Sequence, residues 1–190
     1  GESWFQMPAS LAGQYGSFTF DASGAWTYTL DNEDPDTDAL TQGQEVEDTL
    51  SVMSQDGTAA ATVTITITGA NDVPVIEGDT TGAVTEDGTT ADDGTLTIVD
   101  VDTGESSFVA QADTAGAYGS FSVGTDGVWS YTLDNASAAV QALAAGQTVT
   151  DTFPVASFDG SAVQDVVITV NGANDVPAIE GDTTGEVTED

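Results

Sequence analysis

The sequence repeats itself with a period of 103 residues. Tyr-Gly-Ser-Phe at 15–18 returns at 118–121, and Gly-Ala-Asn-Asp-Val-Pro at 69–74 returns at 172–177, so both offsets are 103 positions (118 − 15 and 172 − 69). Solenoid repeats have periods of about 20–50 residues, whereas whole domains commonly span roughly 100. We therefore expect tandem domains: residues 1–75 as the last three-quarters of a first repeat, 76–178 as a complete repeat, and 179–190 as the start of a third.

All charged side chains of the chain are acidic. The chain has 33 Asp and Glu residues, no Lys, Arg or His, and a formal net charge of −33. Self-repulsion of this size opposes compaction, so we expect the fold to depend on bound cations. The absence of basic side chains argues against nucleic acid or an anionic membrane surface as partner. The absence of Cys excludes disulfides and thiolate metal sites, and no apolar run is long enough for membrane insertion.

Short alternating segments separated by Gly, Asp and Asn predict an all-β fold. About seven strands per repeat favour an immunoglobulin-like β-sandwich. In the complete repeat we place them near 82–86, 94–101, 106–111, 117–123, 128–133, 148–157 and 162–171. The core candidates are Trp129, Tyr131, Phe121 and Phe153, and Trp26 is the copy of Trp129. An Ala-rich stretch, 138–145, predicts one or two helical turns ended by Gly146.

The composition leaves little catalytic chemistry. Without His, Cys or Lys, the usual nucleophile–base pairs cannot form, and paired carboxylates are too common here to indicate a glycosidase. We expect no enzyme. Carboxylates without basic partners suit Ca²⁺, which prefers oxygen ligands. The candidate ligands lie where strands end or repeats meet: Asp31, Asn71, Asp72, Glu86, Asp100, Asp102, Asp134, Asn174 and Asp175.

Strand direction divides these candidates between two poles of a sandwich. Alternating strands would place the ends of strands one, five and seven together, and with them Glu86, Asp134, Asn174 and Asp175. The end of strand two would lie at the opposite pole, where Asp100 and Asp102 would meet Asp31, Asn71 and Asp72 of the preceding repeat. Alternatively, these acidic loops are simply solvated. A further stretch, 34–39 with Glu45, resembles an EF-hand loop, but Ala39 replaces its Gly and the second repeat lacks it; whether it binds an ion stays open.

The ordered motifs Val-Thr-Glu-Asp, Gly-Thr-Leu-Thr, Asp-Val-Asp, Asp-Gly-Val-Trp-Ser-Tyr-Thr-Leu-Asp-Asn and Gly-Ala-Asn-Asp-Val-Pro resemble VCBS-type repeats. These are the bacterial cadherin-like extender domains of giant RTX adhesins, including biofilm adhesins. The resemblance implies tandem cadherin-like sandwiches and Ca²⁺ between repeats, held by the nine residues above. It also implies type I secretion to the bacterial cell surface. The linker is less acidic than usual in cadherins, and Leu-Asp-Asn lacks the usual Glu, so fewer ions per junction are expected.

The function that follows is a calcium-rigidified extender that holds distal binding domains away from the cell. Its partners would be neighbouring repeats of the same chain, and the chain itself would be monomeric. The alternative is a domain that binds sugar, ice or a host protein directly. Trp4, which has Ser107 in its place in the second repeat, is the main candidate for such contact.

Overall fold

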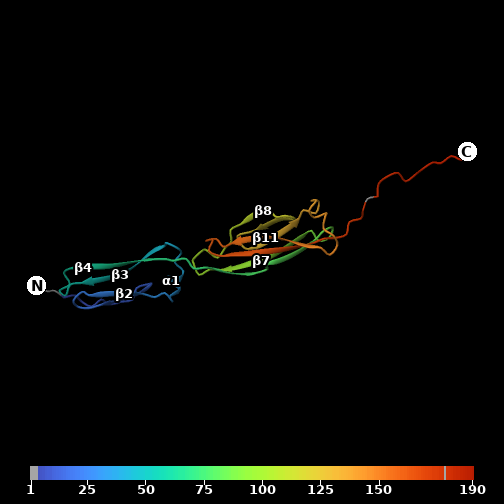
Figure 1. The fold of residues 1–190 in the computed structure, drawn as a ribbon. Helices are drawn as coiled ribbons and strands as arrows, with labels where there is room; N and C mark the ends of the chain where they lie inside the picture. Colours follow the sequence, from blue (N-terminus) through green and yellow to red (C-terminus); the bar gives the residue numbers. More distant parts are fainter. Residues whose placement is uncertain (1–3, 178) are drawn as a thin grey trace. The chain divides into compact units, whose positions relative to one another are not determined.

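A computed structural model describes residues 4–177 and 179–190. The structure is all-β apart from one short helix, as the sequence predicts (Figure 1). Its contacts divide the chain into two compact units. Unit 1 comprises the chain up to Glu77 with Thr97–Val109 and Ala156–Val163. Unit 2 comprises Gly78–Leu96, Ala110–Val155 and Gln164–Asp190. Two loops of the second sequence repeat therefore belong by contact to unit 1.

Unit 1 contains two antiparallel strand pairs. β1 (Gly16–Phe20) pairs with β2 (Trp26–Leu30), and β3 (Glu45–Met53) pairs with β4 (Ala60–Thr68). Alternation along β1 and β3 sends every second side chain inward, and Phe18, Phe20, Leu50 and Val52 form the buried core. The one-turn helix α1 (Pro35–Asp38) follows β2, and the Asp34 side chain caps it by accepting from the Asp36 amide at 2.9 Å.

Unit 2 contains most of two larger sheets. The first has the order β5 (Val75–Gly78), β7 (Ala91–Val99), β10 (Val128–Leu133), β9 (Gly119–Val123) and β8 (Gln111–Ala115). The second has the order β11 (Thr148–Ala156), β12 (Val163–Asn171) and β6 (Thr81–Thr85). Stacking of Phe121 on Phe153, with ring centroids 4.7 Å apart, joins the two sheets. β12 and β6 are parallel, so these two strands end at the same pole.

The buried aromatic residues confirm the predicted core of the complete repeat. Trp129 and Tyr131 are each 1% exposed, and Phe121 and Phe153 are also buried. The Trp129 ring lies over β6 and β7: its Nε1 donates to the Asp79 carbonyl at 2.8 Å, and a Cβ on Gly82 would lie 3.0 Å from its Cη2. Glycine at this position allows the strand and the ring to approach closely.

The copy of this tryptophan in unit 1 is far more exposed. Trp26 is 44% exposed, although β2 pairs with β1 as β10 pairs with β9. The strands that cover Trp129 explain the difference. No counterpart of β6 or β7 occurs in unit 1 among the described residues, so one flank of its core faces solvent.

Two sequence-based predictions of secondary structure were wrong. The strand expected at 106–111 is instead β8 at 111–115: Phe108 is buried, but its backbone forms only an isolated bridge to Ser157. The helix expected at 138–145 is a series of turns, in which Val140 and Leu143 are buried three residues apart. The three-residue spacing of these two apolar side chains therefore indicates that the segment is buried, not that it is a regular helix. No helix in the described part of the chain is long and apolar enough to cross a membrane.

The two tryptophans should differ in their contribution to stability. We expect Trp129→Ala to lower the free energy of unfolding of its unit by about 3–5 kcal/mol, because it leaves a cavity between two sheets. Trp26→Ala removes a half-exposed ring and should cost clearly less. Urea unfolding monitored by circular dichroism checks this, and equal losses for both variants would contradict the assigned packing.

Candidate metal site

The candidate site lies within unit 1 and combines residues of both sequence repeats. Asn71 and Asp72 follow β4, the 100–105 loop follows β7, and Asp159 lies in the turn after β11. Gly160, with φ of +75°, closes that turn in a conformation that favours glycine. The loop ends of three strands thus supply the side chains.

Hydrogen bonds join the segment after β4 to the 100–105 loop and to the turn after β11. The Asp72 amide donates to Asp102 Oδ2 at 2.9 Å, and Asn71 Nδ2 donates to Asp159 Oδ2 at 3.1 Å. The Thr103 amide donates to the Ala39 carbonyl at 3.2 Å. Asp72 therefore contacts the 100–102 loop as predicted, whereas Asn71 contacts Asp159 instead.

Three carboxylates converge at this place. Asp100, Glu105 and Asp159 each offer an oxygen, and these oxygens lie within 4.8 Å of one another. Asp100 and Asp102 each use one oxygen in a hydrogen bond to a backbone amide. Their second oxygens, Asp100 Oδ2 and Asp102 Oδ1, are buried without a partner, and so is Glu105 Oε2. A buried acceptor without a partner has lost its hydration and makes no hydrogen bond that compensates for the loss. A cation bound by these oxygens would supply that compensation.

The other carboxylates that are buried in the described part of the chain accept hydrogen bonds. Asp151 accepts from the Ala117 and Tyr118 amides and from the Tyr131 hydroxyl, at 2.7 to 3.0 Å. Asp48 repeats this arrangement in unit 1 with Tyr28. Burial, and then the hydrogen bond and charge of the Asp partner, raise the pKa of both tyrosines, so each remains a donor. The unpartnered oxygens of the 100–105 loop therefore distinguish it from buried carboxylates with a structural role.

The pKa values at the site reflect burial first, and then like charges and hydrogen bonds. Burial raises the pKa of Glu105, and the charges of Asp102, Asp100 and Asp159 raise it further. The pKa of Asp72 is raised by burial and then by Asp102, Asp38 and Asp100. Asp159 differs: burial acts to raise its pKa, but hydrogen bonds from Ser157, Ser161 and Asn71 prevail and lower it to about 2. Asp159 is thus an anion across the ordinary pH range.

The donor set fits Ca²⁺. This ion takes about six to eight oxygen ligands at roughly 2.3–2.6 Å, from carboxylates, carbonyls and water. Asp100, Asp102, Glu105 and Asp159 supply four carboxylates that no positive side chain neutralises. A bound ion would supply the missing positive charge and hold the two loops against the segment after β4.

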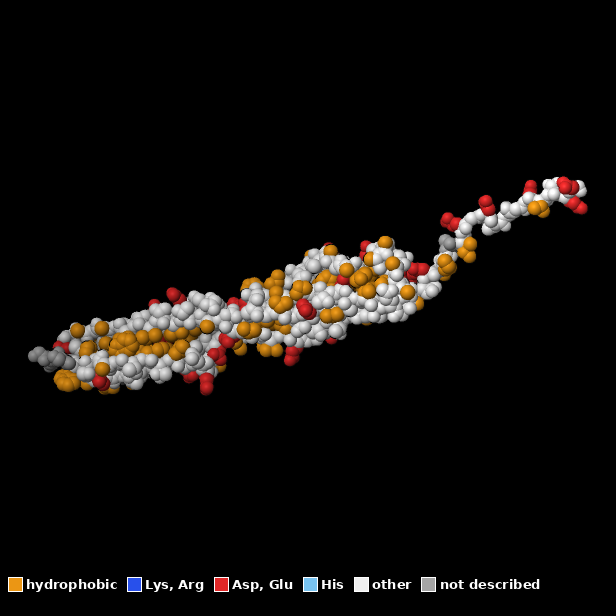
Figure 2. Space-filling view, in the orientation of Figure 1, with side chains coloured by type: hydrophobic (Ala, Val, Ile, Leu, Met, Phe, Trp, Pro, Cys, Tyr) orange, Lys and Arg blue, Asp and Glu red, His pale blue; other side chains and the backbone are white. Residues whose placement is uncertain are grey.

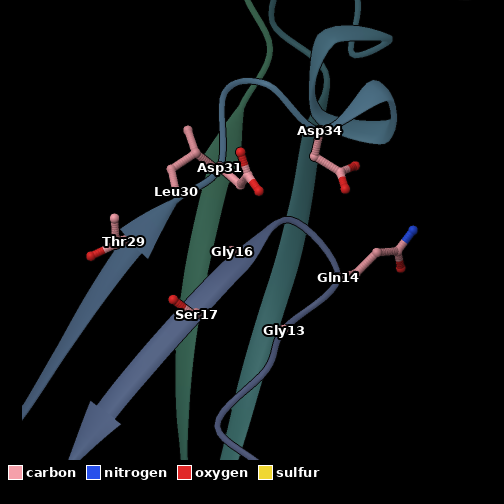
Figure 3. A pocket seen from close by; sticks show the side chains of 8 residues that line it. All are labelled: Gly13, Gln14, Gly16, Ser17, Thr29, Leu30, Asp31 and Asp34. Carbon is pink, nitrogen blue, oxygen red and sulfur yellow. The ribbon is translucent and has the colours of Figure 1, made fainter.

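The other predicted ligands lie elsewhere. Asp31 lines a pocket with Asp34 and Gln14, where both carboxylates come from the loop after β2 (Figure 3). Asp31 accepts from the Glu33 amide at 3.1 Å. Asp34 caps α1, whereas Glu45 lies in β3 opposite Thr68, so the EF-hand-like stretch is divided between a helix and a strand.

Within unit 2, Glu86 is buried at 1% exposure and both of its carboxylate oxygens have partners. Its carboxylate accepts from the Ala173 amide at 3.0 Å and from Gln141 Nε2 at 3.2 Å. Asn174 follows at once and donates from Nδ2 to the Asp175 carbonyl at 3.0 Å. Asp134, Asn174 and Asp175 are exposed. The structure thus joins Glu86 to the segment that precedes Asn174.

Sequence reasoning missed two residues of the acidic cluster. Glu105 closes the same loop as Asp100 and Asp102, and its place after Gly104, with φ of +86°, could have indicated a return of the chain toward Asp100. Asp159 was not among the ligands expected from the sequence. Its distance from the other ligands along the sequence, 54 positions from Glu105 (159 − 105), left no local signal.

Comparison with known proteins identifies the class. The model of the bacterial cadherin-like domain family matches residues 71–172, more than half of the chain, so the chain belongs to this family. The matched span contains Asn71, Asp72, the 100–105 loop and Asp159. Domains of this kind are typically not catalytic. No curated protein matches the chain.

Solved structures give a weaker likeness. The extracellular domain of protocadherin GammaB4 is 18% identical, with 93% of this chain and 27% of that chain covered and a TM-score of 0.47. Drosophila N-cadherin is 15% identical, with 91% and 41% covered and a TM-score of 0.32. Domains 4 and 5 of the S-layer protein SbsC are 14% identical, with 87% and 75% covered and a TM-score of 0.36. The chain spans about a quarter to two-fifths of the two cadherin chains.

Calcium should stabilise the chain through this cluster. At a free Ca²⁺ concentration 100 times Kd, one site adds about 2.7 kcal/mol to the free energy of unfolding. Asp102→Asn and Glu105→Gln should remove much of the calcium-dependent rise in Tm. Glu47→Gln, on an exposed position of β3, is the matched control and should keep it. Equal calcium responses in all three variants would exclude the cluster.

Without calcium, Glu105→Gln should act in the opposite direction. The pKa of Glu105 is raised in the folded state, so its contribution to stability is complete below its ordinary value of 4.5 and is lost as pH rises through the raised value. In EDTA at pH 7 we therefore expect Glu105→Gln to be more stable than the parent, with the advantage vanishing toward pH 4. Thermal unfolding across this pH range in EDTA tests the sign, and a variant less stable than the parent at pH 7 would refute it.

Proposed function

We propose that the chain is a calcium-rigidified extender segment of a large secreted bacterial cell-surface adhesin. Its repeats resemble the VCBS-type repeats of RTX adhesins, which reach the cell surface by type I secretion. Their role is to hold distal binding domains away from the cell. Membership of the bacterial cadherin-like family supports an extracellular module of this kind. The partners of each repeat are then its neighbours in the same chain.

One observation carries the proposal. Three buried carboxylate oxygens lack a partner in a chain without a single basic side chain, and they lie where residues of two repeats meet. Asn71 and Asp72 come from the end of the first repeat, whereas Asp100, Asp102, Glu105 and Asp159 belong to the second. An ion bound by both sets would restrict motion between consecutive repeats. A spacer requires restricted motion between its repeats, because its length depends on it.

Small-angle scattering tests the spacer role. In calcium the chain should have a larger maximum dimension and a narrower distribution of shapes than in EDTA. Asp102→Asn should move the calcium profile toward the EDTA profile while the circular dichroism stays near native. Glu47→Gln should leave the profile unchanged. Scattering that does not respond to calcium, in a chain that binds the ion, would argue against the extender role.

A direct ligand-binding role remains the second candidate because of one exposed aromatic side chain. Trp4 is 59% exposed and could stack on a sugar ring. Binding on a glycan array that Trp4→Ala abolishes would favour this role over the extender. The shared series of motifs in the two repeats favours length over recognition, since a recognition site needs a feature that its neighbours do not share.

A further inference from the structure

A buried serine lies next to Asp159 of the acidic cluster. Ser157 directly follows β11, is 0% exposed, and forms the isolated bridge to Phe108 with its backbone. Its hydroxyl donates to Asp159 Oδ1. A buried hydroxyl needs hydrogen-bond partners in the protein, because burial removes the water that would otherwise serve it. This contact therefore joins a fully buried residue to one of the three carboxylates that converge at the site.

The other partners of the Ser157 hydroxyl fix the direction of this hydrogen bond. The Ala162 amide lies 3.0 Å from Ser157 Oγ and can only donate, so the oxygen accepts there. The single hydrogen of the hydroxyl has two acceptors within reach, Asp159 Oδ1 and, at 3.2 Å, the Ala162 carbonyl. The carboxylate is nearer and charged, and a charged acceptor forms the stronger hydrogen bond. The hydrogen therefore points to Asp159.

Donors from two segments of the chain hold the Asp159 carboxylate. Ser157 donates to Oδ1, and Asn71 Nδ2 donates to Oδ2 at 3.1 Å. The chain has no Lys or Arg side chain that could hold this carboxylate instead, and Figure 2 shows acidic side chains on the visible face without a basic one. Because each oxygen accepts a hydrogen bond, rotation of the carboxylate is restricted. Neutral donors therefore orient this ligand.

The same turn forms in the first repeat, outside the acidic cluster. Ser54 Oγ donates to Asp56 Oδ1 at 2.6 Å, and the Ala59 amide donates to Ser54 Oγ at 3.0 Å. Asp56 belongs to no group of converging carboxylates in the part of the chain that the structure describes. The turn sequences Ser-Gln-Asp-Gly-Thr (54–58) and Ser-Phe-Asp-Gly-Ser (157–161) share Ser, Asp and Gly. The contact between serine and aspartate is therefore encoded locally and does not require the other carboxylates.

We propose that Ser157 is a positioning residue, which orients Asp159 for Ca²⁺ before the ion binds. This role depends on the calcium site of the proposed function and names the residue that prepares one of its ligands. A ligand that is already fixed loses less freedom on binding, so the affinity for the ion is higher. Hydrogen-bond partners of metal ligands typically contribute about 10–100-fold to metal affinity. Ser157 acts through Asp159 and not by coordinating the ion.

Calorimetric titration of the whole chain with Ca²⁺ tests this role, at the site that Glu105→Gln weakens. Ser157→Ala should raise the Kd of that site at least about tenfold and reduce the difference in Tm between calcium and EDTA. Ser157→Thr keeps the hydroxyl and should bind Ca²⁺ more tightly than Ser157→Ala. Ser54→Ala is the matched control, because it removes the same hydroxyl from the same turn while Asp56 lies outside the cluster. Its Kd and its calcium-dependent rise in Tm should equal those of the parent.

Amide hydrogen exchange of the parent in EDTA provides a second measurement that needs no variant. The Ala162 amide should be protected without calcium, because its acceptor, Ser157 Oγ, is already in place. Exchange of this amide at the rate of an unfolded chain overturns the positioning role, and so does a Kd of Ser157→Ala equal to that of the parent. Both results leave calcium binding by the parent intact. A parent that binds no Ca²⁺ at the acidic cluster overturns the proposed function and the positioning role together.

Discussion

The uncompensated negative charge of this chain governs how its carboxylates can be buried. Where neutral donors surround a carboxylate, as Tyr131 and two amides surround Asp151, burial fixes a loop against a strand. Where donors are lacking, as at Asp102 Oδ1 and Glu105 Oε2, the buried oxygens have no hydrogen-bond partner. A bound cation would satisfy them. A chain with lysines or arginines could satisfy such oxygens internally. Here the positive charge has to come from solution, which couples the fold to its ionic surroundings.

The two units show how strongly one strand affects a sandwich. β10 and β2 have nearly the same sequence, yet Trp129 is buried and Trp26 is half-exposed. The difference lies in β6 and β7, which cover Trp129 and place Gly82 and Gly94 under its ring. Burial of an aromatic residue is therefore a property of the strands that flank it as much as of its own alternation.

Much of the fold could be predicted from the sequence. Alternation located β10, which was expected at 128–133, because this signal is local. The strand expected at 106–111 was wrong because Phe108 is buried from a loop, where the backbone forms only an isolated bridge to Ser157. Four of the expected ligands lie at the acidic cluster, namely Asn71, Asp72, Asp100 and Asp102, whereas Glu105 and Asp159 were not among those expected. Ion binding by these residues stays a prediction. The contact of Asp159 with Asn71 spans 88 positions, and only the folded arrangement of the loops brings these residues together.

The most direct test of Ca²⁺ binding at the acidic cluster is the structure of crystals grown in the presence of Ca²⁺. The account predicts an ion whose ligands include oxygens of Asp100, Glu105 and Asp159, at roughly 2.3–2.6 Å. Asp102 Oδ1 should also have gained a partner, either the ion or a water bound to it. Anomalous scattering distinguishes calcium from water at this place. Density for water alone among these carboxylates, in crystals grown at millimolar Ca²⁺, would contradict the account.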